Sequence, residues 1–237
     1  MPVKKDFSDL TVIIPTLNEE GNIGRLIQIL TRMYNNVRII VSDDGSTDQT
    51  KKEVMKANAT NRRVVFIDHS AAKTKGLTSS VIYAAMKVKT PKVVVMDGDM
   101  QHPPKIVGKI AAQLGNNDLC VGVRVKVKNW GLYRMILSKG ISDFSYLVFM
   151  MRGKPTCNDM MSGFFGIKTS LLKDIISANR EGFVMKGYKV LLDILRMAGR
   201  DIKIAEVPYS TFHPRKKGKS KLRAVHMVDV LISTFRR

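Results

Sequence analysis

The chain of 237 residues has few of the features that mark a cross-linked or membrane-spanning protein. It contains two cysteines, Cys120 and Cys157, without a CxxC spacing. That count argues against a disulfide framework or a structural zinc site and favours free thiols in a reducing compartment. No apolar run approaches the ~18 residues needed to cross a bilayer, and no signal-like segment stands at the N-terminus. We therefore expect that this chain alone does not cross a membrane.

Acidic residues are scarce relative to basic ones. The chain has 20 Asp and Glu against 40 Lys and Arg, which gives a formal net charge of +20. Such a surplus favours a polyanionic partner, either nucleic acid or an anionic membrane surface, although solvated lysines account for part of it. Aromatic residues make up only 7% of the chain, and no zinc-finger or RNP pattern is present. We therefore expect no nucleic-acid partner and favour the membrane surface.

The sequence does contain a regular alternation of strand-like and helix-like segments. Strands are expected at 10–15, 37–42, 63–67, 92–97 and 118–123, and helices at 19–34, 48–59, 76–87 and 103–114. This order predicts an α/β fold with a mostly parallel central sheet flanked by helices. The alternation lapses after Gly122. The later part is expected to contain strands at 163–168 and 202–211, helices at 169–177 and 186–198, a basic loop at 212–221 and a last helix.

The segment 93–104, Val-Val-Val-Met-Asp-Gly-Asp-Met-Gln-His-Pro-Pro, carries the clearest chemical signal. A short apolar strand precedes Asp97, Asp99 and Gln101, and alternate residues of an extended chain point to the same side. Oxygen ligands of this kind suit Mg²⁺ or Mn²⁺ bound together with a substrate diphosphate. A solvated acidic turn is the alternative for this segment taken alone. His102, just before two prolines, is expected to be structural.

Two further strands end in polar loops, in the segments 10–20 and 37–48. Ligands of open parallel sheets bind beyond the carboxyl ends of the strands. If these two strands and the strand before Asp97 are neighbours, their loops form one site. The sequence therefore predicts a site for a metal-bound diphosphate, such as that of a nucleotide sugar.

The segments 14–19, 42–46 and 97–104 together resemble the family 2 glycosyltransferases of the GT-A fold. Within that family they are similar to the dolichol-phosphate (polyprenol-phosphate) mannose synthases. Further matches lie at 75–80, 133–140, 162–166, 187–193 and 220–222, so the resemblance covers about residues 10–222. It implies a GT-A (Rossmann-like) domain over 1–237, with a nucleotide-binding half at about 8–124 and an acceptor- and membrane-facing half at about 125–237.

The resemblance implies an inverting, metal-dependent transfer of mannose from GDP-mannose to a dolichyl or polyprenyl phosphate. The product would be a β-linked polyprenyl phosphate mannose for glycosylation pathways. No general base is required, because a phosphate monoester has its second pKa near ~6 and is largely a dianion at neutral pH. A polyprenol-phosphate glucosyltransferase that uses UDP-glucose, and a family 2 enzyme with a hydroxyl acceptor, remain alternatives. From a different class, a basic nucleic-acid-binding protein whose acidic loops are merely structural is a third alternative.

The same resemblance assigns roles to individual residues. The metal ligands are Asp97, Asp99 and Gln101, and the catalytic residues are Asp99, Arg124, Arg134 and Lys139. The donor contacts are Pro15, Leu17, Glu19, Ser42, Asp44, Asp97, Gly98, Asp99, Arg124, Lys189, Arg215 and Lys221.

Individual donor contacts are expected to differ in kind. Asp44 is expected to bind guanine, because a carboxylate can accept two of its N–H groups, whereas Asp48 is assigned to helix capping. Relatives often have an aromatic residue in place of Leu17, which limits that contact to apolar packing. Gly98 is expected to let the backbone approach the diphosphate. An ion pair with Asp193, four residues away on one helix face, is the alternative role for Lys189.

Two segments are expected to face a membrane or an acceptor. Residues 130–151 are rich in apolar side chains and fit either interfacial helices in the headgroup region or a core segment. Residues 211–223 resemble the family's mobile acceptor loop. The protein is therefore expected to be peripheral on the cytoplasmic face of a membrane, the endoplasmic reticulum in a eukaryote or the plasma membrane in a prokaryote. A membrane anchor subunit or a missing C-terminal transmembrane segment would hold it there.

Overall fold

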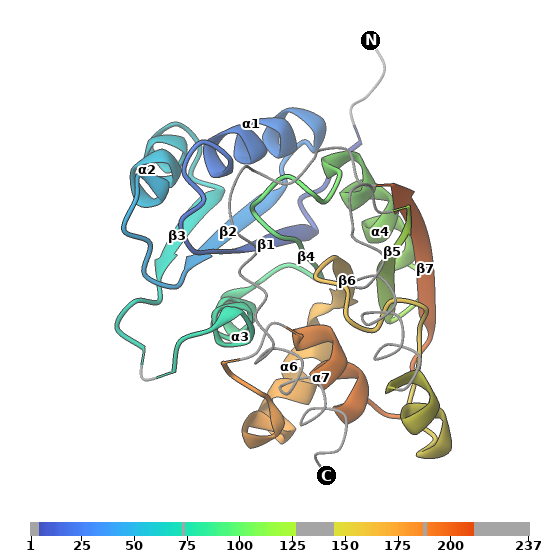
Figure 1. The fold of residues 1–237 in the computed structure, drawn as a ribbon. Coiled ribbons are helices and arrows are strands. Elements are labelled where there is room, and N and C mark those ends of the chain that lie inside the picture. Colours follow the sequence, from blue (N-terminus) through green and yellow to red (C-terminus); the bar gives the residue numbers. More distant parts are fainter. Residues whose placement is uncertain (1–4, 73, 127–144, 187–188, 211–237) are drawn as a thin grey trace.

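A seven-stranded sheet in the order β3-β2-β1-β4-β6-β5-β7 forms the centre of the computed structural model, which describes residues 5–72, 74–126, 145–186 and 189–210 (Figure 1). The strands are β1 (Leu10–Thr16), β2 (Arg38–Asp43), β3 (Val64–Asp68), β4 (Lys92–Val95), β5 (Leu119–Lys126), β6 (Phe165–Lys168) and β7 (Ile204–Ser210). All are parallel except β6, which runs antiparallel to both β4 and β5. The expected α/β class with a mostly parallel sheet is confirmed.

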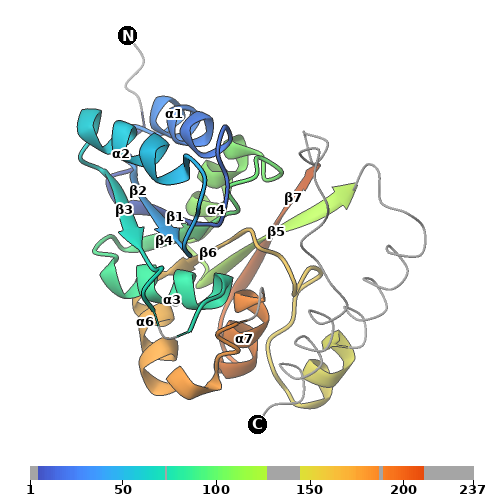
Figure 2. The ribbon, with the colours of Figure 1, turned by 60° about the vertical axis from the view of Figure 1, so that its left-hand side comes forward.

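Helices cover both faces of the sheet, as Figures 1 and 2 show. They are α1 (Ile23–Met33), α2 (Thr50–Thr60), α3 (Leu77–Lys87), α4 (Val107–Gln113), α6 (Thr169–Ala178) and α7 (Val190–Met197), with 3₁₀ turns η1 (Pro104–Ile106) and η2 (Arg180–Gly182). Residues 145–151 are helical as well. One apolar core lies between the sheet and α3, α6 and α7, and a second core lies between the sheet and α1, α2 and α4.

The central strand β1 shows why the sheet needs helices on both faces. Every residue of β1 is buried. Ile13 belongs to the core beneath α3, whereas its neighbours Val12 and Ile14 belong to the core beneath α1. Because successive side chains of a strand point to opposite faces, a continuous apolar run of this kind requires cover on both.

Helix α1 begins at Ile23 rather than at residue 19, because side chains of α2 accept hydrogen bonds from the backbone N–H groups just before it. The Glu19 N–H donates to Thr50 Oγ1 at 2.8 Å, and the Gly21 N–H donates to Glu53 Oε1 at 2.8 Å. Gly21 also has a φ of 77°, in the left-handed region. Residues 19–22 therefore form a turn attached to α2, which fixes the loop after β1.

Insertion of β6 is the main departure from simple strand alternation. Its residues pair with β4 in the register Val94↔Gly166 and with β5 in the register Cys120↔Gly166. A Cβ at Gly166 would lie 2.5 Å from Ile110 Cγ2 of α4, so only glycine fits between sheet and helix there. The strand that completes the sheet therefore comes from far along the chain.

The two cysteines and the apolar segments were expected to form neither a disulfide nor a membrane span. Cys120 and Cys157 are free and buried, and burial raises the pKa of the Cys120 thiol to about 12. Both thiols therefore lie within the fold rather than in a disulfide. Over the described ranges, no helix has the length and apolar character needed to cross a membrane.

Candidate active site

The carboxyl ends of three neighbouring strands meet at the candidate site. Pro15 of β1 is in register with Ser42 of β2, and Ile13 of β1 is in register with Val95 of β4. The Met96 N–H still donates to the Ile13 carbonyl at 3.1 Å, so the chain leaves β4 beside β1 and brings Asp97 next to Pro15. The condition set by the sequence, that these three strands be neighbours, is met.

The loop after β4 holds two partly exposed carboxylates. Asp97 has 37% of its side chain exposed, and Asp99 is also partly buried. The Gln101 N–H donates to Asp99 Oδ1 at 3.1 Å. Between them, Met100 is buried and has a φ of 64°, a conformation that is costly for a residue other than glycine or asparagine. The left-handed Met100 therefore turns the chain between Asp99 and Gln101.

The buried side chain of His102 supports this loop from the side of the protein core. Its Nδ1 accepts the Asp97 N–H at 3.1 Å, so a hydrogen on Nε2 points towards Asp97 Oδ2, 3.7 Å away. The imidazole stacks on Phe164 with ring centroids 4.8 Å apart. Burial lowers the pKa of His102 to about 4, so the ring is neutral at physiological pH. His102 therefore has the structural role expected of it.

Gly163 lies directly against the Asp97 carboxylate. A Cβ on Gly163 would be 3.0 Å from Asp97 Oδ2 and 3.1 Å from Oδ1. Any side chain at position 163 would therefore displace the carboxylate. This contact was not predicted, although the segment 162–166 was among those that carried the family resemblance.

Gly98 packs against β1 on the side where its side chain would be. A Cβ there would lie 3.4 Å from Thr16 Cγ2 and 3.4 Å from Glu19 Cγ. These are ordinary van der Waals distances, so packing against β1 does not by itself require glycine at this position. Its expected contact with a diphosphate stays a prediction.

A second cluster, of Arg124, Asp159 and Lys189, lies near Asp97, whose negative charge acts against burial to raise the pKa of both Arg124 and Lys189. Arg124 Nε donates to Asp159 Oδ2 at 3.0 Å, and Nη2 lies 3.4 Å from Oδ1, a two-pronged ion pair. The pair is only partly exposed, with 27% of the Arg124 side chain and 14% of the Asp159 side chain accessible. Burial lowers the pKa of Arg124, but Asp159 outweighs it and the pKa is raised overall. Asp159 was missed in the sequence, where its only signal is its place three residues before Ser162.

Lys189 belongs to this cluster rather than to a surface ion pair. Its Nζ donates to the Met161 carbonyl at 3.0 Å, while Asp193 pairs with Arg196 at 3.3 Å. Burial lowers the pKa of Lys189 to about 8, and the nearby positive charge of Arg124 adds to this effect. The structure therefore brings Lys189 and Arg124 together, as the functional alternative for Lys189 requires.

Three aspartates at the end of β2 and in the loop after it have different surroundings. Asp43 is buried and accepts hydrogen bonds from Thr16 Oγ1 at 2.8 Å and from the Ser46 N–H at 2.7 Å, so it holds the turn together. Asp48 accepts the Thr50 N–H at 2.9 Å and the Glu20 N–H at 3.0 Å, in agreement with its expected capping role. Asp44 is the member of the group that faces a histidine.

Asp44 forms a chain of polar contacts with two residues that were not predicted. Its Oδ1 lies 3.4 Å from His69 Nδ1, and His69 Nε2 lies 3.4 Å from Ser79 Oγ. His69 is 5% exposed and directly follows β3, the strand next to β2. The buried imidazole therefore restrains the orientation of the Asp44 carboxylate.

The remaining predicted donor contacts surround the end of β1. Pro15 is buried, and Leu17 and Glu19 are partly buried. Ser42 is fully buried, and its Oγ has no hydrogen-bond partner within the described part of the chain. Four predicted site residues, Arg134, Lys139, Arg215 and Lys221, lie outside the described residues.

The donor set at this site suits a divalent ion that is shared with a substrate. Asp97 and Asp99 offer hard carboxylate oxygens, and Gln101 can add an amide oxygen. No group of three or more His, Cys, Asp or Glu side chains that could hold a metal occurs among the residues described. Mg²⁺ is usually bound by one or two protein carboxylates together with substrate phosphates and water.

The family model described as Glycosyl transferase family 2 matches residues 11–176. The chain belongs to this family. Two of its relatives are named dolichol-phosphate mannosyltransferase. The one from Pyrococcus furiosus is 32% identical over 96% of this chain and 63% of its own length. The one from Saccharomyces cerevisiae is 30% identical over 94% of this chain and 84% of its own length. The chain thus spans less than two thirds of the Pyrococcus furiosus protein.

A solved structure confirms the GT-A fold. Glucosyl-3-phosphoglycerate synthase from Mycobacterium tuberculosis, crystallised with Mn²⁺, UDP and glucosyl-3-phosphoglycerate, has a TM-score of 0.68 and 20% identity. The match covers 95% of this chain and 79% of that one. The family model and the named relatives confirm the predicted resemblance to family 2 and to its dolichol-phosphate mannosyltransferases.

Proposed function

We propose that this family 2 member transfers mannose from GDP-mannose to a dolichyl or polyprenyl phosphate with inversion at the anomeric carbon. The observation that carries the proposal is that Arg124 and Lys189 lie close enough to Asp97 for its negative charge to act against burial and raise the pKa of both cations. The carboxylates suit a metal-bound donor diphosphate, and the cations near them suit a second phosphate. The names of the relatives support the choice of a polyprenol phosphate as acceptor.

The donor half of the site follows from the strand ends. Asp97 and Asp99 would hold Mg²⁺ or Mn²⁺, which neutralises the charge that builds on the departing nucleoside diphosphate. Asp44, oriented by His69 at 3.4 Å, would accept hydrogen bonds from the ring N–H and the amine of guanine. Pro15 and Leu17 would line the space between the base and the diphosphate.

The acceptor half needs no general base. A lipid phosphate monoester is already largely a dianion near neutral pH, so its oxygen can attack the anomeric carbon as it stands. Arg124 is fixed by Asp159 and can span two phosphates, and Lys189 adds a second positive charge. These cations reduce the repulsion between the two anionic substrates and hold the nucleophile opposite the leaving group.

The proposed place of action is the cytoplasmic face of a membrane, where the protein would be peripheral. The acceptor is a membrane lipid, and the net charge of +20 favours anionic lipid surfaces. An anchor subunit or a C-terminal transmembrane segment outside this sequence would strengthen that attachment.

A direct assay tests the proposed donor and acceptor. Purified protein with Mn²⁺ and a short polyprenyl phosphate should transfer labelled mannose from GDP-mannose, with little transfer of glucose from UDP-glucose. Asp99→Asn should lower kcat by about 10²-fold or more, because it removes charge where the transition state needs it. Asp9→Asn, which also removes one partly exposed carboxylate, is the matched control and should keep its activity.

Two outcomes would reject the proposal. Preferential use of UDP-glucose would make the protein a glucosyltransferase. Salt-sensitive RNA binding without any metal-dependent nucleotide binding would place it outside sugar transfer altogether.

A further inference from the structure

The segment 158–163 contacts both cations of the candidate active site. Asp159 binds Arg124 through two hydrogen bonds, at 3.0 Å to Nε and 3.4 Å to Nη2. Two residues further on, the Met161 carbonyl accepts a hydrogen bond from Lys189 Nζ at 3.0 Å. The positions of both cations therefore depend on where this segment lies.

The same segment also reaches the metal side of the site. Ser162 Oγ donates to the Gly122 carbonyl of β5 at 2.8 Å, which attaches this end of the segment to the sheet. The next residue, Gly163, lies against the Asp97 carboxylate, because a Cβ there would be 3.0 Å from Oδ2. One short stretch of backbone therefore contacts a proposed metal ligand as well as the two cations.

A single side chain of β7 holds the other end of the segment. The Asn158 N–H donates to Glu206 Oε1 at 2.6 Å, and Asn158 Nδ2 donates to Glu206 Oε2 at 2.6 Å. Two short bonds to one carboxylate fix the direction of a group as well as its distance. Asp159 directly follows Asn158, so this fork sets the place from which Asp159 reaches Arg124.

The alternation of side chains along β7 explains why Glu206 reaches the segment. Val207 packs in the core beneath α1, α2 and α4, so the preceding Glu206 points to the opposite face of the sheet. Cys157 and Met160, on either side of residues 158 and 159, pack in the core on that opposite face, beneath α3, α6 and α7. The Glu206 carboxylate and the segment therefore lie on the same face.

We propose that Glu206 is a positioning residue for the transfer reaction. By holding Asn158 it fixes Asp159, and through Asp159 it fixes the guanidinium of Arg124. The inference rests on the proposed function, in which Arg124 binds phosphate, whereas Glu206 itself touches neither substrate nor metal. Without the fork, the Arg124–Asp159 pair remains but can shift, and displacements on the order of an ångström cost up to about a hundredfold in rate.

An exchange of the two functional groups tests the fork. Glu206→Gln replaces one acceptor oxygen by an amide nitrogen, which then opposes the Asn158 amide, and Asn158→Asp places two carboxylates against each other. In the double variant Glu206→Gln/Asn158→Asp, the new amide donates to the new carboxylate, and its oxygen still accepts the backbone N–H of position 158. Both hydrogen bonds are therefore restored with their roles reversed.

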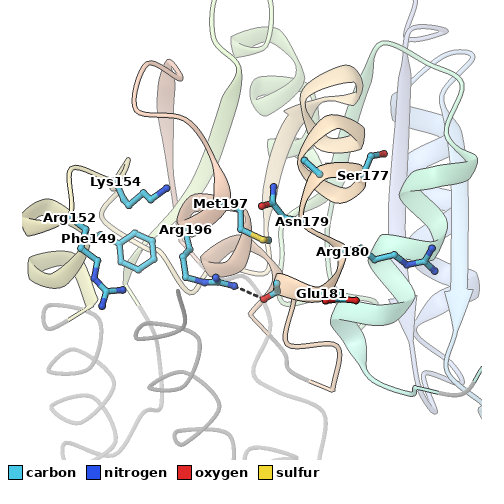
Figure 3. A pocket seen from close by; sticks show the side chains of 11 residues that line it. Phe149, Arg152, Lys154, Ser177, Asn179, Arg180, Glu181, Arg196 and Met197 are labelled. Atoms are coloured by element: carbon cyan, nitrogen blue, oxygen red, sulfur yellow. Dashed lines mark hydrogen bonds between the residues drawn. The ribbon is translucent and has the colours of Figure 1, made fainter.

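Steady-state kinetics with GDP-mannose and a polyprenyl phosphate measure the effect. Each single variant should lower kcat about tenfold or more, and the double variant should recover to within about threefold of the wild type. Glu181→Gln is the matched control. It also removes one carboxylate, from an exposed residue that lines a cavity of about 830 Å³ beside the end of α7 (Figure 3). Neither Asn158 nor Glu206 lines that cavity, and this control should keep its kcat.

A measurement without substrates separates a failure of this inference from a failure of the proposed function. The Arg124 Nε–H signal in a proton–nitrogen correlation spectrum, assigned by its loss in Arg124→Lys, reports the hydrogen bond to Asp159. It should shift or broaden in both single variants and return in the double variant. If the wild type transfers no mannose but the signal follows this pattern, the proposed function is wrong and the positioning of Arg124 stands.

Two results would overturn the inference. One is a wild-type Arg124 signal in both single variants, because the fork would then not control the guanidinium. The other is a double variant that stays as slow as the single ones, because the loss of kcat would then not come from the two hydrogen bonds.

Discussion

Asp97 depends on the residues that pack around its carboxylate and its backbone. His102 accepts its N–H at 3.1 Å, and Gly163 leaves the space that the carboxylate occupies. The acid itself was evident in the sequence, because two carboxylates follow an apolar strand. Its packing against Gly163 was not, because the two residues are 66 positions apart and only the sheet brings them together.

Gly163→Ala should lower kcat by about tenfold to a hundredfold. The new Cβ would lie 3.0 Å from Asp97 Oδ2, so the carboxylate must shift, and displacements on the order of an ångström have effects of this size. Steady-state kinetics with GDP-mannose measure the change. Gly199→Ala is the control, since its Cβ would meet nothing within 4 Å. Unchanged kinetics in Gly163→Ala would show that the position of Asp97 does not matter.

We expect Lys189 to set an alkaline limit on the proposed activity. The pKa of Lys189 is lowered to about 8 by burial, so the free enzyme loses this positive charge as the pH rises through that value. We therefore expect kcat/KM to fall above about pH 8. Lys189→Arg should keep the charge and move the decline to higher pH, because arginine does not deprotonate in this range. The same alkaline decline in wild type and variant would exclude Lys189 as its cause.

At the scale of elements, α7 illustrates how a helix brings a residue to the site. Asp193 is 1% exposed, accepts the Val184 N–H at 3.0 Å and pairs with Arg196 at 3.3 Å. These contacts attach α7 to the segment before it and so fix the position of Lys189, the residue that precedes α7. The spacing of Lys189 and Asp193 suggested that they pair, but spacing along a helix does not show which partner comes from elsewhere in the fold.

Asp193→Ala should lower the free energy of unfolding by about 3–5 kcal/mol, because it leaves Arg196 as a buried charge without its partner. Urea denaturation measures the change. Asp174→Ala removes an exposed carboxylate from α6 and is expected to stay within about 0.5 kcal/mol of the wild type. Similar small losses in both variants would mean that the buried pair does not anchor α7.

The strand β6 shows a second limit of element-by-element prediction. A strand was expected at 163–168, and β6 occupies Phe165–Lys168. Its antiparallel place between β4 and β5 was not predicted. Strand propensity depends on the local residues, but the choice of neighbour depends on contacts such as Val94↔Gly166, across 72 positions.

At the scale of the whole molecule, the nucleotide and the metal together should raise the thermal stability of the protein. Mn²⁺ with GDP, each at about 100 times its dissociation constant, should raise Tm by roughly 5–10 °C, because ligands that bind only the folded state stabilise it. Differential scanning fluorimetry measures the shift. Asp99→Asn should lose most of it, and Mn²⁺ with UDP at the same concentrations as Mn²⁺ with GDP should give a smaller shift. An equal shift with UDP would contradict the assignment of Asp44 to guanine.

Local patterns in the sequence were enough to place the main helices and strands and the acidic loop at 97–101. They were enough because burial on both faces, helix periodicity and a carboxylate-bearing strand end all depend on residues close together in the chain. Tertiary structure alone decided that Asp159 holds Arg124, that His69 stands behind Asp44, and that cations from separate segments line one cavity beside α7. Each of these contacts joins distant positions, and only packing of the sheet and its helices determines which distant residues meet.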